Sequence, residues 1–262
     1  MSSEQILVDK GMLNLAGKKI HYIDEIQGLG HLKSVKKLNF SDNFISDIMP
    51  LAKLESLLTI DELSFFNNKL RDMNGIEQFT SLRSLTLSRN KIDAIRGLDK
   101  LVNLTELFLD DNSITEIQGL SSLVNLKILW LGDNRIREIK NLDRLVNLEE
   151  LYIGFNAIKR ITGLDNLVNL RELVLIYNEI EEIEGLDNLR SLESLNINYN
   201  RIKEIRGLGN MMKIRNLAIG KNPIPDAELK KCGGVDGEGH ALDPIRFHLH
   251  CRREIAKPAE KK

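Results

Sequence analysis

The residues most able to do chemistry lie close together near the C-terminus, where both cysteines and most of the histidines fall within residues 232–251. They are Cys232, His240, His248, His250 and Cys251. Thiolate and imidazole groups are zinc ligands, so a metal site is one alternative, and a disulfide or redox role is another. The segment contains no CxxC or HxxxH pair, and four glycines in 233–239 favour a mobile loop. We therefore expect no metal site here.

Motifs for catalysis are missing from the sequence. It contains no Walker loop, no HExxH and no GxSxG, and the glycines of 233–239 do not sit between a strand and a helix. Carboxylates recur along the chain, but acid–base chemistry needs burial that shifts their pKa, and they are expected on an open surface. The sequence predicts a protein that is not an enzyme and needs no cofactor.

An internal repeat organises most of the chain. An asparagine recurs every 22 residues within the pattern LxxLxLxxNxIxxIxGLxxLxx, at Asn68, Asn90, Asn112, Asn134, Asn156, Asn178, Asn200 and Asn222. Two weaker units precede these, one around Asn43 and one at Leu13–Ser34, where Lys18 takes the asparagine position. The spacing from Asn43 to Asn68 is longer, with extra residues at Leu54–Ile60, which form either a bulged loop or a binding insert.

Each part of the repeat has a physical meaning. Alternating leucines predict a short strand whose leucines face inward, and stacked strands form a parallel sheet. The asparagine can bond the backbone at the turn that follows, so a ladder with a structural role is expected. The IxGL glycine, replaced once by Asn141, indicates a turn with positive φ. The next leucines leave room for little more than a turn of α or 3₁₀ helix.

These features predict an α/β solenoid, a right-handed superhelix with a concave parallel sheet and short helical or 3₁₀ turns on the convex side. We divide the chain into an N-terminal cap (1–12), about nine to ten repeats (13–222), a C-terminal cap (223–256) and a disordered tail (257–262). The second cap is expected to contain a helix, with Asp243 as N-cap and Pro244 at its first position. Phe247, Cys251 and Ile255 then share the face that covers the last repeat.

The candidate binding residues lie between the core leucines, on or beside the concave face. The fifth repeat position gives an aromatic stripe of Phe108, Trp130 and Tyr152, and the eighth position adds Phe155, Tyr177 and Tyr199. Acidic residues accompany them at Glu106, Asp110, Asp111, Asp133, Glu150 and Glu172. Aromatic anchors inside a polar rim favour protein binding, and the acids favour a basic partner surface. The alternative is that aromatic residues only suit strands.

Composition narrows the class of partner. Lys plus Arg total 37 against 38 for Asp plus Glu, so the formal net charge of -1 gives no field that selects nucleic acid or membrane. We find neither a secretory signal nor an apolar run long enough to span a bilayer. The sequence therefore predicts a protein that is monomeric alone, resides in the cytoplasm or nucleus, and binds another protein.

The repeat, with its NxIxxIxGLxxLxxL segment, resembles the leucine-rich repeat subfamily typified by the nuclear regulatory subunit of protein phosphatase 1. The resemblance covers about Leu13 to Asn222 and implies a regulator or scaffold that docks a phosphatase catalytic subunit, with Phe108, Trp130 and Tyr152 on the binding face. Internalins, which are secreted adhesins, and other intracellular adaptors have similar units and remain alternatives. The segment after Asn222 departs from the regulator's capping motif.

Overall fold

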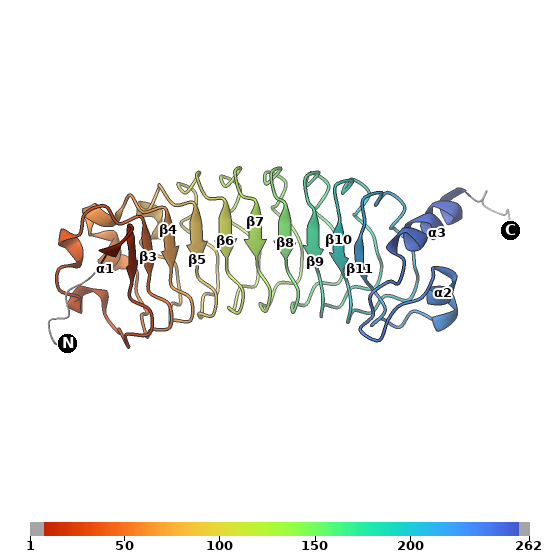
Figure 1. Cartoon of the computed structure of the whole chain (residues 1–262), viewed down its shortest axis with the longest axis horizontal. Coiled ribbons are helices and arrows are strands. Elements are labelled where there is room, and N and C mark those ends of the chain that lie inside the picture. Colours follow the sequence, from red (N-terminus) through yellow and green to blue (C-terminus); the bar gives the residue numbers. More distant parts are fainter. Residues whose placement is uncertain (1–7, 257–262) are drawn as a thin grey trace. The chain divides into compact units, whose positions relative to one another are not determined.

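The computed structural model describes residues 8–256, with side chains described up to Arg252. Residues 1–7 of the expected N-terminal cap and all of the expected tail, 257–262, lie outside this range. The described chain falls into two compact units, residues 8–130 and 131–256. Each unit is a stack of solenoid turns (Figure 1), as the repeat predicted.

In the first unit, β1 to β7 pair in chain order. β1 joins β2 antiparallel, whereas the later pairs are parallel and place repeat leucines such as Leu85 and Leu107 opposite each other. The strands are β1 (Val8–Asp9), β2 (Met12–Asn14), β3 (Lys37–Asn39), β4 (Glu62–Ser64), β5 (Ser84–Thr86), β6 (Glu106–Phe108) and β7 (Ile128–Trp130). β2 is the first parallel strand, and its outer edge would have unpaired backbone groups without β1. β1 pairs with that edge.

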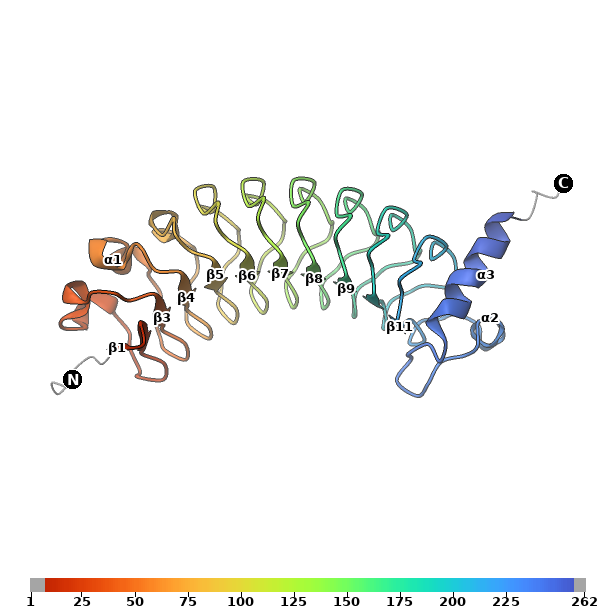
Figure 2. The same cartoon turned by 45° about the horizontal axis from the view of Figure 1, so that its top comes forward.

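The second unit continues the same pattern. Its strands are β8 (Glu150–Tyr152), β9 (Glu172–Val174), β10 (Ser194–Asn196) and β11 (Asn216–Ala218), all parallel and in register. Within each unit the strands run along one side and the turns along the other (Figure 2). The residues between the core leucines of one unit consequently share one sheet face.

The helices lie between residues 23 and 78 and after residue 225 of the described chain. The first unit has α1 (Met49–Ala52) and the 3₁₀ helices η1 (Ile23–Glu25), η2 (Leu29–His31), η3 (Glu55–Leu57) and η4 (Ile76–Gln78), and the second has α2 (Asp226–Lys231) and α3 (Pro244–Ala256). α1 and η3 take up the extra length before Asn68. Because Leu51 and Leu57 are fully buried and Ser56 Oγ donates to the Gly30 carbonyl at 3.1 Å, this insertion serves packing, which favours the structural alternative.

The repeat leucines and isoleucines fill the interior, and the asparagine ladder satisfies the backbone beside them. Asn178 is typical: its Nδ2 donates to the carbonyls of Ile153 and Leu175 at 3.0 and 3.1 Å, and its Oδ1 accepts from the Ile158 N–H at 3.0 Å. One side chain thus satisfies three buried backbone groups. The predicted structural role of the asparagine is confirmed.

The turn glycine behaves as predicted. Gly97, Gly119, Gly163, Gly185 and Gly207 have φ between 66° and 75°, and Asn141, their one replacement, has φ 61°. A Cβ on Gly207 would overlap the carbonyl oxygen of Ile183 in the preceding repeat. Glycine therefore provides both the left-handed backbone and the close approach of successive turns.

The C-terminal cap contains the expected helix, because α3 begins at Pro244 and buries Phe247 and Cys251. His248 is also buried, with Nδ1 3.3 Å from the carbonyl of Leu208 in the last complete turn. Ile255, the third residue assigned to this face, lies where side chains are outside the described structure.

The glycine-rich segment before α3 differs from its prediction as a mobile loop. The N–H groups of Ile219 and Gly220 donate to the Gly239 carbonyl at 2.9 and 2.8 Å, and the Ala241 N–H donates to the Leu217 carbonyl at 2.7 Å. β11 would otherwise be an edge strand with unpaired backbone groups. The loop therefore folds back to pair with that edge.

Candidate functional site

Of the cysteines and histidines in the tail, Cys232, His248 and Cys251 are buried, whereas His240 is exposed and His250 is half-buried. Among the residues that the structure describes, no group of three or more His, Cys, Asp or Glu side chains is placed to hold a metal ion. Cys232 and Cys251 are buried free thiols. Burial raises the pKa of Cys232 to about 11, and the neighbouring Cys251 makes a smaller contribution in the same direction. The Cys232 thiol is protonated at neutral pH, which makes it a poor metal ligand and a poor nucleophile.

In the first unit, β6 and β7 bring two of the predicted aromatic residues together. Phe108 and Trp130 are Cα partners, and their rings meet edge to face with centroids 5.1 Å apart and an interplanar angle of 87°. Both side chains are half-buried on the sheet face. Such a pair contributes about 0.5–1.5 kcal/mol beyond the burial of its area, so it forms a firm apolar surface.

Two of the three acidic residues predicted in this unit already have partners. Asp110 accepts a hydrogen bond from Ser88 Oγ at 2.5 Å, and Asp111 lies 3.6 Å from Arg89 Nε. Glu106, on β6, is half-buried beside the aromatic pair. The negative charge that the first unit offers a partner is therefore smaller than the sequence suggested.

In the second unit, Tyr152 lies among acidic residues. Glu150 and Glu172 are Cα partners on β8 and β9. Burial raises the pKa of Tyr152, and a hydrogen bond from its hydroxyl to Glu172 and the charges of both glutamates raise it further. The phenol stays protonated and its orientation is set by Glu172, so this part of the face is both acidic and ordered.

The eighth-position residues Phe155, Tyr177 and Tyr199 form a continuous stack, which we call the aromatic ridge. The ring centroids of Phe155 and Tyr177 are 4.5 Å apart, and those of Tyr177 and Tyr199 are 4.2 Å apart and almost parallel. The three residues remain 52%, 43% and 39% exposed. Partial burial raises the pKa of Tyr177, and the electrostatic interaction and hydrogen bond with Tyr199 raise it further. The ridge thus presents a large apolar surface to solvent.

The backbone of the ridge is strained, which the sequence reasoning missed. The eighth position has positive φ at Asp42, Asn67, Arg89, Asp111, Asp133, Phe155, Tyr177 and Tyr199. Aspartate and asparagine tolerate this conformation, whereas bulky residues pay about 1–3 kcal/mol for it. The recurrent Asp and Asn were the available signal. Since the same conformation recurs where the residue is not aromatic, the turn of the repeat imposes it, and the three aromatic residues adopt it at a greater cost than aspartate or asparagine would.

Comparison with known proteins identifies the family. The family model described as Leucine Rich repeats (2 copies) matches residues 102–144 and 146–188. The solved structure of internalin C2 from Listeria monocytogenes is 32% identical, with a TM-score of 0.65, and the match covers 71% of this chain and 80% of that one. The chain belongs to the leucine-rich repeat proteins. Proteins of this family typically bind partners and do not catalyse reactions.

Other leucine-rich repeat structures are also similar. Internalin F from Listeria monocytogenes is 29% identical with a TM-score of 0.73, over 82% of this chain and 62% of that chain, so this protein spans less than two thirds of its length. A leucine-rich repeat protein of Leptospira interrogans is 23% identical with a TM-score of 0.65, over 75% of this chain and 57% of that chain, and shows the fold alone. No curated protein sequence gives a significant match.

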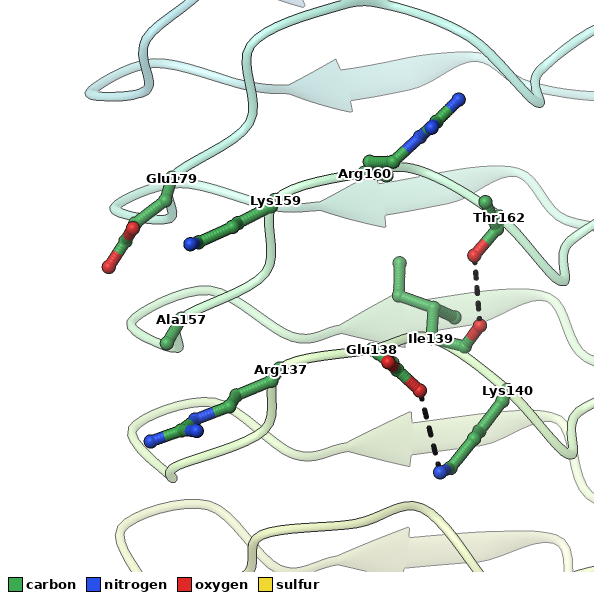
Figure 3. Close-up of a pocket in the computed structure, with 9 residues that line it drawn as sticks. All are labelled: Arg137, Glu138, Ile139, Lys140, Ala157, Lys159, Arg160, Thr162 and Glu179. Carbon is green, nitrogen blue, oxygen red and sulfur yellow. Dashed lines mark hydrogen bonds and ion pairs between the residues drawn. The ribbon is translucent and has the colours of Figure 1, made fainter.

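This leucine-rich repeat protein has a second surface feature, which the sequence did not single out. A hollow of about 720 Å³ lies on the second unit, along the segments that follow Asn134 and Asn156 (Figure 3). We call it the basic hollow; its lining residues are Arg137, Glu138, Ile139, Lys140, Ala157, Lys159, Arg160, Thr162 and Glu179.

The helices within the described range are all too short or too polar to cross a bilayer.

Proposed function

We propose that this leucine-rich repeat protein is a scaffold or regulatory subunit that docks a partner protein on its sheet face. The observation that carries the proposal is the aromatic ridge, because three stacked rings stay exposed at strained backbone positions. The Phe108–Trp130 pair and Tyr152 supply further anchors on rigid strands. Exposed aromatic residues of this kind are frequent hot spots in protein interfaces.

The acidic residues define the partner's surface. Glu150 and Glu172 lie side by side next to Tyr152. Asp133, which occupies the eighth position one repeat before Phe155, is exposed. A partner with basic groups would complement this charge. The resemblance to the phosphatase regulator makes a catalytic subunit of the protein phosphatase 1 type the first partner to test, and a cytoplasmic or nuclear location accompanies that proposal.

The decisive experiment is isothermal titration calorimetry of the full chain with a purified phosphatase 1 catalytic subunit. Replacing Trp130 and Tyr152 by alanine should weaken binding by about 2 kcal/mol or more, because hot-spot rings lose that much when truncated. The matched control replaces Val102 and Val168, exposed valines on the turn side, by alanine and should leave the affinity unchanged. Circular dichroism checks that all variants fold.

Two other outcomes separate the parts of the proposal. If the phosphatase does not bind, the partner assignment fails, and affinity purification from the source cells with the same variants tests the scaffold role. If a confirmed partner binds the Trp130→Ala, Tyr152→Ala variant and a Tyr177→Ala, Tyr199→Ala variant as tightly as the parent, the sheet face is not the docking surface.

The likeness to internalins favours a second candidate, a surface adhesin. Its support is the 32% identity with internalin C2 over most of that chain. Protease treatment of intact source cells tests it: degradation of the protein before lysis places it outside and contradicts the cytoplasmic or nuclear location, whereas full protection rejects the adhesin.

A further inference from the structure

The basic hollow carries more positive charge than its surroundings neutralise. Its lining contains four cations (Arg137, Lys140, Lys159 and Arg160) and two carboxylates (Glu138 and Glu179), a net charge of 4 − 2 = +2. The hollow lies in the second unit alone, and no residue of the aromatic ridge lines it. It is thus a surface of opposite sign to the acidic part of the sheet face.

Most charged side chains near the hollow already have partners. Lys140 Nζ is 3.5 Å from Glu138 Oε2. Arg160 holds Glu184 through two hydrogen bonds, of 2.7 and 3.1 Å. Glu179 Oε2 lies 3.2 Å from Arg201 on the side of the next repeat. These carboxylates are therefore not available to the remaining cations.

Arg137 and Lys159 are the two cations left over. They occupy the same position in successive repeats, both are exposed, and they project in the same direction in Figure 3. Within the described part of the chain, neither side chain makes a hydrogen bond or ion pair. Because both line the same hollow from adjacent repeats, one short ligand can reach the two charges together.

The next repeat limits the size of that ligand. Glu181 follows Arg137 and Lys159 at the same repeat position, and Glu179, Glu182 and Glu184 surround it. A long polyanion that extended beyond two repeats would meet these carboxylates, and the lining contains no aromatic ring on which a base could stack. The surroundings favour a short acidic stretch of polypeptide over a nucleic-acid strand.

We propose that the basic hollow is a docking site for a short acidic segment of a partner protein, with carboxylates paired to Arg137 and Lys159. In an extended segment, side chains two residues apart point the same way about 6.7 Å apart, which suits a Glu-x-Glu pattern spanning two flexible cations. Charge-assisted hydrogen bonds to guanidinium and ammonium groups supply the attraction. This site is independent of the proposed docking on the sheet face.

The test titrates the peptide acetyl-Ser-Glu-Ser-Glu-Ser-Glu-Gly-amide into the ¹⁵N-labelled full chain at low salt and follows amide shifts by NMR. Shifts confined to 137–140 and 157–162 are expected. Replacing Arg137 and Lys159 by glutamine should lower the affinity about tenfold or more, because two charge-assisted bonds are lost. The matched control replaces Lys203 and Lys213, exposed lysines of the same unit, and should change the affinity for the peptide by less than about twofold.

Further titrations separate a specific site from general attraction between charges. A peptide with glutamine in place of glutamate should give no shifts, and the Trp130→Ala, Tyr152→Ala variant should bind the acidic peptide as the parent does. If the Lys203, Lys213 variant loses as much affinity as the Arg137, Lys159 variant, the effect is one of general charge and the site is overturned. Tighter binding of oligo-dT at the same residues would also overturn it, since the hollow would then select a polyanion.

Discussion

At the scale of single residues, the role of the repeat asparagine could be predicted from the sequence, whereas the conformation of the eighth-position residue was missed. The asparagine could be assigned its role because an amide at a fixed period has one obvious use, satisfying the backbone of neighbouring turns. The positive φ at Phe155, Tyr177 and Tyr199 was missed, because aromatic residues rarely adopt it and the only signal was the Asp or Asn at the same position of other repeats. The candidate aromatic residues were found, but their backbone conformation was not.

The ladder leads to a prediction about stability. Asn178→Ala should lower the free energy of unfolding by about 1–3 kcal/mol, because the buried Ile158 N–H loses its acceptor and the carbonyls of Ile153 and Leu175 each lose one of two donors. Asn169→Ala is the matched control: its side chain is exposed and donates one bond, to the Val146 carbonyl at 2.9 Å, so it should cost less than about 1 kcal/mol. Urea unfolding of both variants measures the difference, and equal losses would contradict the structural role.

At the scale of elements, strands were predictable and their terminal partners were not. Alternating leucines identify each strand from local sequence, and Pro244 is the first residue of α3 as predicted. The pairing of 239–241 with β11 joins segments that no local pattern connects. A glycine-rich segment looks mobile when its hydrogen-bond partners cannot be seen, and for that reason the pairing of this loop was not predicted.

The pairing of this loop can be tested at one glycine. Gly239 has φ 86°, and a Cβ there would lie 2.9 Å from Asn198 Oδ1. Gly239→Ala should destabilise the cap by about 1–3 kcal/mol and speed hydrogen exchange at the Ile219 and Gly220 amides. Gly237→Ala, where a Cβ would meet nothing within 4 Å, should leave exchange unchanged. Identical exchange in both variants would show that the loop does not protect the edge.

At the scale of the whole molecule, a net charge of -1 conceals an uneven distribution. Acidic residues flank Tyr152, whereas the basic hollow carries a surplus of cations. Composition alone excluded a strong overall field but could not locate these regions, because their charges come from residues 22 positions apart that the solenoid brings side by side. The family and fold followed from the repeat; the partner did not, since the repeat fixes the core and leaves the surface residues free to vary.

Local charge predicts how a sheet-face partner associates. Raising NaCl from about 0.05 to about 0.5 M should slow association with a basic partner several-fold and change dissociation less, because salt screens steering between exposed charges. Surface plasmon resonance with a confirmed partner separates the two rates. An association rate that does not respond to salt would assign recognition to the aromatic residues alone.

The edge-to-face pair of Phe108 and Trp130 has one more consequence. Trp130 is the only tryptophan of the chain, and it lies half-buried on the proposed docking face. Intrinsic fluorescence excited at the red edge of the indole band therefore comes from a single point of the molecule. A partner without tryptophan that covers β7 should move this emission to shorter wavelength, so that docking can be followed without any label.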